Sequence, residues 1–411
     1  MTISSSLLAR YEAVRSASMA LAEPLSDEDC CVQSMPDASP IKWHLAHTTW
    51  FFETFVLERF EANFKPFQPA FRMLFNSYYN GVGAKHPRPQ RGLLTRPDMA
   101  EIEDYRSDVD ARIEALLLIA AAPTYIPSSE LEHLIVLGLN HEQQHQELML
   151  TDILHLLSCN PLHPAYDPAP YVPAPAAPPL QWQTHPAGIV EIGHLGGGFS
   201  FDNELPRHRH YVEAFELASR LVSNAEYLAF VEAGAYDDPG LWLAEGWDWL
   251  RANEITHPLY WRQSAEGWSE FTLHGLVPLD GERAARHLSY FEADAYARWA
   301  GARLPTEAEW ESAAAAAISP SPAQPPAQGP ELSQLFDTGW QWTSSSYAPY
   351  PGFQPAGGAV GEYNGKFMVN QYVLRGASSA TPPGHSRPSY RNFFPSHARW
   401  QFTGIRLARS V

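Results

Sequence analysis

Within a run over residues 129–157, where apolar side chains recur at helical spacing, lies the stretch Asn140-His141-Glu142-Gln143-Gln144-His145-Gln146-Glu147-Leu148. Two histidines four residues apart on a helix project from the same face, which is the spacing that two metal ligands on one helix require. Two imidazoles alone do not hold a catalytic metal firmly, so a third ligand has to come from elsewhere in the chain. A pair of solvated surface histidines is the alternative that this motif leaves open.

The surrounding sequence predicts a helical bundle. Apolar residues recur at helical spacing over 4–22, 41–60 and 104–121 as well, which predicts about four helices in the first 157 residues. The stretch Asp37-Ala38-Ser39-Pro40 predicts the start of the 41–60 helix, with Ser39 or Asp37 as its cap and Pro40 in the first turn. Residues 61–100, rich in Gly, Pro and aromatic residues, predict a long structured loop, and such loops are usually functional.

The length of 411 residues favours two domains. We expect a helical bundle over 1–159, a proline-rich linker over 160–185 and a second domain over 186–411, in which short strand-like runs outnumber helices. In that domain a helix begins after Thr306, which caps it, with Glu309 closing a capping box. The expected fold class is an α+β multidomain protein.

Charge and cysteine content narrow the possible partners and the compartment. The net charge of −18 argues against a nucleic-acid backbone or an anionic membrane as the partner. Three cysteines (Cys30, Cys31 and Cys159) make neither a disulfide framework nor a CxxC zinc motif, which indicates a reducing compartment. No run of 18 apolar residues occurs, and we expect a cytoplasmic protein.

His47 is the candidate for the third ligand. It lies in the aromatic stretch Lys42-Trp43-His44-Leu45-Ala46-His47-Thr48-Thr49-Trp50-Phe51-Phe52-Glu53, on another helix of the same bundle. Bundles build metal sites from side chains that project inward from facing helices, so His47, His141 and His145 would form a three-histidine set with open positions on the metal. Zinc, iron, copper and nickel all suit such ligands, and a hydrogen-bonded core histidine is the structural alternative for His47.

The long loop holds two further pairs of candidates. Tyr78 and Tyr79 are phenols able to deliver a proton beside an oxygen-activating metal, and packing of the loop on the bundle is the alternative explanation for them. Arg88 and Arg91 lie on a segment constrained by Pro and Gly, and guanidinium groups bind carboxylates through two parallel hydrogen bonds. Ordinary surface arginines are the alternative.

Taken together, these motifs resemble the ergothioneine-biosynthesis sulfoxide synthases, the EgtB family, over nearly the whole chain. The histidine-bearing stretches resemble a DinB-like four-helix bundle. The second domain resembles the formylglycine-generating-enzyme fold, a C-type-lectin-like domain, on several short motifs. These are Arg303-Leu304-Pro305-Thr306-Glu307-Ala308-Glu309-Trp310, the run from Trp340 to Ser345, Leu374-Arg375-Gly376, Tyr390-Arg391-Asn392 and Gly404-Ile405-Arg406-Leu407-Ala408.

The resemblance implies a role for each candidate residue. It implies non-heme Fe(II) on His47, His141 and His145, with His44 as a neighbour and not a ligand. It implies that Tyr78 and Tyr79 are the tyrosine pair of one branch of the family, and that Tyr363 is the candidate for the role that the C-terminal domain fills in another branch. Further positions that match the family's substrate-binding residues are Arg88 and Arg91 for the thiol's carboxylate, and Gln144, Asn392 and Phe393 for hercynine.

The family joins a thiol to the imidazole carbon of hercynine (Nα-trimethylhistidine), using O2 and forming a sulfoxide. Members that use γ-glutamylcysteine carry an acidic residue just after the Asn-aromatic pair, whereas this chain has Phe394 there. The resemblance therefore predicts cysteine as the thiol donor. An aromatic ring such as Phe393 beside the trimethylammonium group has a physical basis in cation–π attraction.

The expected function is that of a cytoplasmic, Fe(II)- and O2-dependent hercynylcysteine sulfoxide synthase, with Tyr79 delivering the proton or hydrogen atom. The nearest alternatives are an ovothiol-type synthase acting on histidine and a selenoneine-type relative, which carry out the same kind of chemistry on a different substrate. A zinc hydrolase or transferase on the same bundle, and a non-catalytic binding protein, are the alternatives from other classes.

Overall fold

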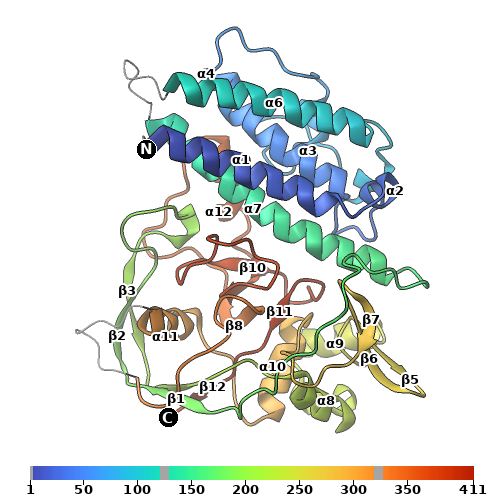
Figure 1. Cartoon of the computed structure of the whole chain (residues 1–411). Coiled ribbons are helices and arrows are strands. Elements are labelled where there is room, and N and C mark those ends of the chain that lie inside the picture. The colour runs from blue at the N-terminus through green and yellow to red at the C-terminus, as the bar shows by residue number, and fades with distance from the viewer. Residues whose placement is uncertain (1–2, 121–128, 319–326) are drawn as a thin grey trace. The chain divides into compact units, whose positions relative to one another are not determined.

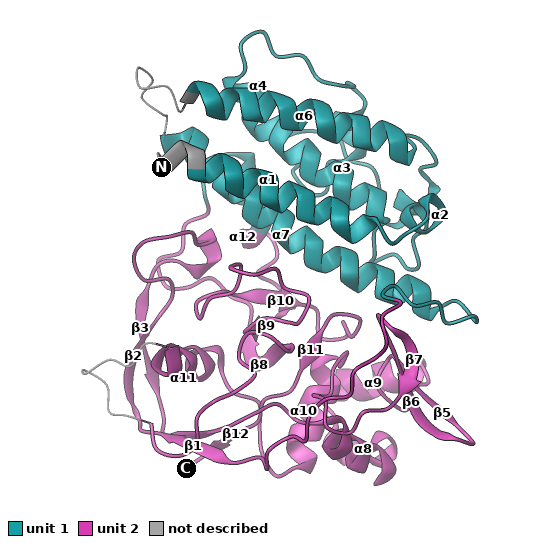
Figure 2. Ribbon diagram, viewed as in Figure 1, with its two compact units in different colours: residues 1–167, 356–363 teal, residues 168–355, 364–411 magenta. Residues whose placement is uncertain are grey.

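The computed structural model describes residues 3–120, 129–318 and 327–411, and the chain divides into two compact units (Figures 1 and 2). The first unit comprises Met1–Asp167 together with Ala356–Tyr363, and the second comprises Pro168–Pro355 and Asn364–Val411. The second unit thus begins inside the proline-rich stretch, while the boundaries expected at residues 159 and 185 stay a prediction. A short segment late in the chain belongs with the first unit.

Long helices build the first unit and lie side by side in Figure 1. Helices α1 and α3 each pack against both α6 and α7, so the predicted helical bundle is confirmed. The bounds of the helices in this unit are α1 (Ile3–Ala22), α2 (Asp27–Cys31), α3 (Ile41–Phe52), α4 (Glu58–Phe60), α5 (Phe71–Leu74), α6 (Met99–Ala120) and α7 (Ser129–Ser158). Residue 121, expected at the end of the third helix, lies outside the described residues.

Helix α3 is the innermost element of this bundle. All 12 of its residues are buried, as expected of a helix that is enclosed on every side. A π-helical turn at Glu53–Leu57 joins it to α4, so the helix predicted over 41–60 is present with one widened turn. The predicted cap is wrong, because Pro40 itself is the N-cap and no side chain caps the helix. The backbone N–H of Ser39 donates to Asp152 instead.

A buried carboxylate ties α1, α6 and α7 together beside the histidine motif. Glu142 pairs with Arg15 at 2.8 Å and with Arg106 at 3.0 Å, and it also accepts a hydrogen bond from Ser18 at 2.6 Å. Burial by itself would raise the pKa of Glu142, but the attraction of the two arginines outweighs burial and lowers this pKa to about 2. Replacing one member of such a buried network typically costs about 3–5 kcal/mol, so the network fixes the position of α7.

The second unit combines small sheets with short helices. Its largest sheet has the strand order β10-β9-β8-β11, in which only the β8–β11 pair is parallel. A second sheet has the order β1-β4-β12, a third β5-β6-β7, and β2 pairs with β3. The strand bounds are β1 (Trp182–His185), β2 (Gly188–Ile192), β3 (His208–Val212), β4 (Phe215–Ala218), β5 (Trp261–Ser264), β6 (Gly267–Thr272), β7 (Gly275–Pro278), β8 (Trp340–Ser346), β9 (Tyr372–Arg375), β10 (Asn392–Phe394), β11 (Thr403–Gly404) and β12 (Ala408–Ser410).

Helix α11 carries the charged centre of this unit's core. Glu307, its first residue, pairs with Arg375 at 2.8 Å and with Arg391 at 2.9 Å. The predicted capping box is confirmed, since Thr306 and Glu309 each accept a hydrogen bond from the other's backbone N–H. The helix bounds in this unit are α8 (Asn224–Glu232), α9 (Ala244–Ala252), α10 (Tyr290–Trp299) and α11 (Glu307–Ile318). The short helix α12 (Glu362–Gly365) begins in the segment that belongs with the first unit. In the described part of the chain, no helix has both the length and the apolar character needed to cross a membrane.

Candidate active site

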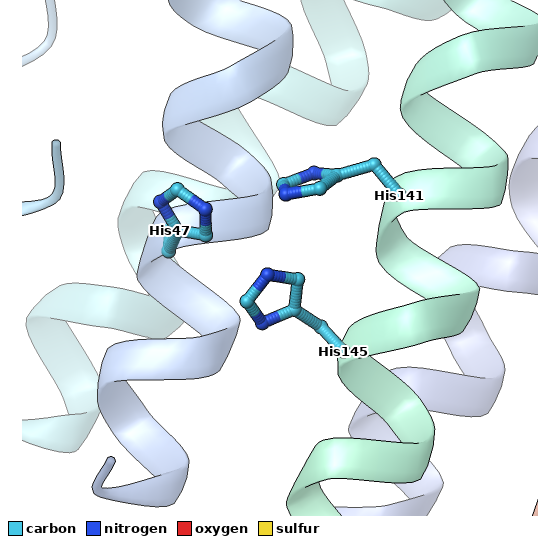
Figure 3. A group of neighbouring side chains, drawn as sticks. All are labelled: His47, His141 and His145. Carbon is cyan, nitrogen blue, oxygen red and sulfur yellow. The ribbon is translucent and has the colours of Figure 1, made fainter. Parts of the chain in front are cut away.

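The three histidines predicted as metal ligands converge inside the first unit. His47 projects from α3, and His141 and His145 project from successive turns of α7 toward it (Figure 3). One ring nitrogen from each histidine can be chosen so that all three atoms lie within 4.8 Å of one another. An ion placed among three such atoms can reach all of them at ordinary metal–nitrogen distances of about 2.0–2.1 Å once the side chains adjust.

Burial and hydrogen bonding both fit a metal at this point. His47 Nε2 and both ring nitrogens of His141 are buried without a hydrogen-bond partner among the described residues. Buried polar atoms are rarely left unpaired, and a metal ion would give these nitrogens a partner. Burial lowers the pKa of His47 and of His145 well below the ordinary value and lowers that of His141 to about 4. The three rings are therefore neutral at pH 7, which is the form that binds metals.

Aromatic rings and a backbone carbonyl hold His47 in place. Its Nδ1 lies 2.6 Å from the carbonyl oxygen of Phe75, so Nδ1 carries the proton and donates while Nε2 keeps its lone pair. Trp43 stacks on one side at a centroid distance of 4.6 Å, and Trp50 stacks at 5.5 Å. The ring therefore has little freedom to turn, which favours a preformed ligand position.

His44 lies beside the three histidines but is not one of the converging set. Its Nδ1 lies 2.8 Å from Nδ1 of His145, and its Nε2 lies 3.0 Å from Oδ2 of Asp152. Both ring nitrogens are thus engaged, and neither is available to a metal.

Tyr78 and Tyr79 pack into the same region of the first unit. The ring of Tyr79 lies 5.6 Å from that of Trp50, which in turn stacks on His47. Burial raises the pKa of Tyr79 above its ordinary value, and a hydrogen bond from the hydroxyl of Tyr78 opposes this. Burial also raises the pKa of Tyr78. Both phenols are therefore protonated at pH 7 and have a proton to give.

The segment Ala356–Tyr363 completes the surroundings of the tyrosine pair. The ring of Tyr363 stacks on that of Tyr78 at a centroid distance of 5.0 Å. The carboxylate of Glu362 accepts hydrogen bonds from the backbone N–H groups of Asn80 at 3.0 Å and Gly81 at 2.7 Å. Two residues distant in sequence thus contact the loop that carries Tyr78, one through a ring and the other through backbone hydrogen bonds.

Arg88 and Arg91 occupy different environments although only three residues separate them. Arg91 is buried, its guanidinium carbon lies 3.3 Å from the ring centre of Trp43, and its Nη1 donates to Ser39 Oγ at 2.8 Å. Burial, with a smaller contribution from Arg88, lowers the pKa of Arg91 to about 9. Arg88 is exposed and donates to the backbone carbonyl of Asp37. Among the described residues Arg91 has no ion-pair partner, so its charge is available to an anion.

The remaining candidates are distributed over both units. Gln144 is half-buried on α7. Asn392, Phe393 and Phe394 form β10 of the second unit and are also half-buried. Phe393 stacks on Tyr347 at 4.1 Å. The structure thus brings together the histidine, tyrosine and arginine candidates within the first unit, while the β10 residues belong to the other unit.

Several residues that organise this site are not predicted by the sequence motifs. Trp43 lies four residues before His47 and Trp50 lies three residues after it. On a helix this spacing brings both tryptophans to the same side as His47, and it is the feature of the sequence that could have predicted their contacts with the histidine. Asn76 is fully buried, and its side chain accepts from Tyr79 N and donates to carbonyls of the tyrosine loop. Nothing in the sequence near Asn76 indicates this role.

With this geometry established, comparison with known proteins identifies the family. A hercynine oxygenase from Mycobacterium tuberculosis is 30% identical over 420 residues, which cover 94% of this chain and 94% of that protein. The chain belongs to the hercynine oxygenase family. A second member, from Mycolicibacterium smegmatis, is 30% identical over 421 residues, covering 92% of this chain and 93% of its own length.

Each unit of this hercynine oxygenase family member also matches a broader family. The DinB superfamily matches residues 10–149, and the sulfatase-modifying factor enzyme 1-like domain matches residues 181–325. A formylglycine-generating enzyme from Streptomyces coelicolor is 33% identical over 166 residues, which cover 34% of this chain and half of that protein. The expected α+β class, with a DinB-like bundle and a formylglycine-generating-enzyme-like domain, is confirmed.

Proposed function

We propose that this protein is an Fe(II)- and O2-dependent sulfoxide synthase that joins cysteine to hercynine in ergothioneine biosynthesis. Membership of the hercynine oxygenase family supports the reaction class and hercynine as substrate. The observation that carries the proposal is the set of three buried, converging imidazoles, two of which, His47 and His141, have ring nitrogens with no hydrogen-bond partner among the described residues. A cytoplasmic location stays our expectation from the cysteine content.

His47, His141 and His145 would hold the metal. Three neutral nitrogen ligands leave positions open for substrates, as in catalytic sites and unlike closed structural ones. Bound Fe(II) supplies the redox chemistry by which O2 oxidises a thiolate and an imidazole carbon. The stacked rings of Trp43 and Trp50 keep His47 in position and exclude water from its sides.

Arg91, assisted by Arg88, would bind the carboxylate of cysteine. A buried guanidinium without an ion-pair partner gains strongly from an incoming carboxylate, because a charge-assisted hydrogen bond contributes roughly 1.5–3 kcal/mol. Its contact with Trp43, the ring that stacks on His47, puts this charge near the metal ligands. We assign cysteine over γ-glutamylcysteine because Phe394 stands where an acidic residue would be expected.

Gln144, Asn392 and Phe393 would bind hercynine. Gln144 directly precedes the ligand His145 on α7. Asn392 offers an amide, and the face of Phe393 suits the trimethylammonium group through cation–π attraction. These three assignments rest on the family resemblance of the positions.

Tyr79, with Tyr78 beside it, would deliver the proton or hydrogen atom that directs oxidation toward the sulfoxide. Both hydroxyls are protonated at pH 7, and Tyr78 donates to Tyr79, so a proton lost from Tyr79 can be replaced from Tyr78. The overall reaction balances as thiol plus imidazole C–H plus O2, giving the C–S bond, the sulfoxide oxygen and one water.

The test is oxygen consumption by the protein reconstituted anaerobically with Fe(II), then mixed with hercynine, cysteine and O2. We expect uptake that requires both substrates and yields hercynylcysteine sulfoxide. Preference for histidine over hercynine in the same assay would favour an ovothiol-type reaction. No uptake with Fe(II), together with hydrolytic activity of the zinc-loaded protein, would favour the hydrolase alternative.

A further inference from the structure

A series of buried hydrogen bonds connects the proposed ligand His145 to a carboxylate on the same helix. We call this series, His145–His44–Asp152, the hydrogen-bond relay. His145 Nδ1 lies 2.8 Å from His44 Nδ1, and His44 Nε2 lies 3.0 Å from Asp152 Oδ2. All three side chains are buried, with Asp152 6% exposed and His44 2% exposed. Asp152 follows His145 by two helical turns on α7, so both ends of the hydrogen-bond relay belong to one helix.

The donors and acceptors along this relay can be assigned by starting from Asp152. Asp152 Oδ2 also accepts the backbone N–H of Ser39 at 2.7 Å, which identifies that oxygen as an acceptor. His44 Nε2 therefore carries a proton and donates to it. In a neutral His44 ring Nδ1 is then an acceptor, so the proton between the two histidines belongs to His145 Nδ1.

This assignment leaves His145 Nε2 as the nitrogen with a free lone pair, the form that binds a metal. The opposite arrangement would put a proton on His145 Nε2 and block it as a ligand. The three histidines are also supported unequally, since His47 donates to a neutral carbonyl and His141 has no ring-nitrogen partner among the described residues. Within the described residues, His145 is the one member of the three that hydrogen bonds connect to a carboxylate.

We propose that His44 and Asp152 are positioning residues for the metal centre, because their hydrogen bonds fix the tautomer and the orientation of the His145 ring. The inference rests on the three-histidine metal site of the proposed function. Partners of this kind orient a ligand ring and raise its basicity, and their loss typically lowers metal affinity about 10–100-fold.

The relay also joins the metal ligands to the proposed substrate arginine. Ser39 donates to Asp152 through its backbone and accepts from Arg91 through its hydroxyl. Arg91 and His145 are therefore both connected to Asp152 by hydrogen bonds, which fixes the position of the guanidinium group relative to the histidine ring.

Binding of Co(II), a spectroscopic probe that needs no turnover, tests the relay in the full-length protein. We expect His44→Leu and Asp152→Asn to weaken Co(II) binding about 10–100-fold and to shift the visible ligand-field bands. The first variant removes the hydrogen bonds of the relay, and the second removes the negative charge at its end. His44→Gln retains one acceptor and one donor and should recover most of the lost affinity.

His155→Gln is the matched control, because His155 also lies on α7 but hydrogen-bonds to Ser34 at 2.8 Å. It should bind Co(II) as the wild type does. Thermal unfolding of each metal-free variant separates a loss of affinity from a loss of fold. Wild-type affinity and spectrum in both His44→Leu and Asp152→Asn would overturn the relay, as would a His44→Gln variant that binds no better than His44→Leu. If the wild type binds no Co(II), the metal site itself is wrong, a result distinct from failure of the relay alone.

Discussion

The guanidinium carbon of Arg91 lies 3.3 Å from the ring centre of Trp43, a contact that fixes a buried positive charge beside the histidine cluster. Trp43 stacks on His47 through its own ring, so Arg91, Trp43 and His47 form a continuous stack. A cation over an aromatic face is worth about 2 kcal/mol or more when both are removed from water. Within the described part of the chain no carboxylate forms an ion pair with Arg91, which supports our proposal that Arg91 binds the carboxylate of cysteine.

Replacing Arg91 by lysine should weaken the binding of cysteine selectively. Lysine lacks the planar fork that stacks on Trp43 and binds a carboxylate through two hydrogen bonds, so we expect KM for cysteine to rise roughly 10–100-fold. Steady-state kinetics with each substrate varied in turn provide the measurement. KM for hercynine should stay near its wild-type value.

Arg88→Lys is the control for this prediction, because Arg88 is exposed and the same chemical change there should raise KM for cysteine less. An Arg91→Lys enzyme with wild-type KM for cysteine would contradict the assignment of Arg91.

Tyr79→Phe should alter the products more than the binding of substrates. The buried, protonated phenol is lost while the ring that packs on Trp50 is kept. We expect sulfoxide formation to fall by about 10²-fold or more, the usual scale of a positioned proton donor, with cysteine sulfinate appearing in its place. Product analysis by mass spectrometry measures both. Tyr78→Phe should have the smaller effect, and a Tyr79→Phe enzyme with normal sulfoxide yield and no added sulfinate would remove Tyr79 from the mechanism.

Glu362→Ala should loosen the loop that carries the tyrosine pair. The carboxylate accepts from two consecutive backbone N–H groups, Asn80 and Gly81, and both lose their partner in the variant. Hydrogen exchange followed by mass spectrometry should show faster exchange in peptides covering residues 76–84. Glu362→Gln keeps an acceptor oxygen and should show a smaller change. Unchanged exchange in Glu362→Ala would mean that the segment Ala356–Tyr363 does not hold the loop in solution.

The stability of the second unit should fall as the solution becomes acidic, with His185 contributing. His185 is buried and stacks on Phe215 at 4.6 Å, and burial lowers its pKa to about 4. The unfolded chain, with an ordinary histidine pKa of about 6.5, binds a proton first as the pH falls. His185 therefore costs no stability above pH 6.5 and lowers the free energy of unfolding between pH 6.5 and 4, by on the order of 3 kcal/mol in total.

Denaturant unfolding at several pH values measures this effect. His185→Phe keeps a stacked ring and should lose part of the pH dependence, whereas His210→Gln, at an exposed position of β3, should retain it. An unchanged pH profile in His185→Phe would show that this histidine is not buried in its neutral form.

The sequence predicted the bundle and the three histidines because periodicity and ligand spacing are local properties of each helix. The HxxxH motif and the aromatic helix around His47 contain that information directly. The cap of α3 was predicted wrongly because Ser39 makes long-range hydrogen bonds to Asp152 and Arg91 that no local pattern reveals.

The contacts that sequence reasoning could not reach join residues far apart in the chain. His44 and Asp152 are separated by 108 positions, and Asn80 and Glu362 by 282. Such pairs depend on how helices and segments pack, and with one sequence there is no signal that links them. The burial of Arg91 and the exposure of Arg88 cannot be predicted from the sequence either, because no local pattern distinguishes the two arginines.

The most direct test of the central claim is the stoichiometry of oxygen consumption by the Fe(II)-loaded protein with hercynine and cysteine. We expect one O2 to be consumed for each hercynylcysteine sulfoxide formed, with no uptake by His141→Ala, which lacks one of the three proposed ligands. Absence of uptake by the wild type, or equal uptake and product by His141→Ala, would contradict it.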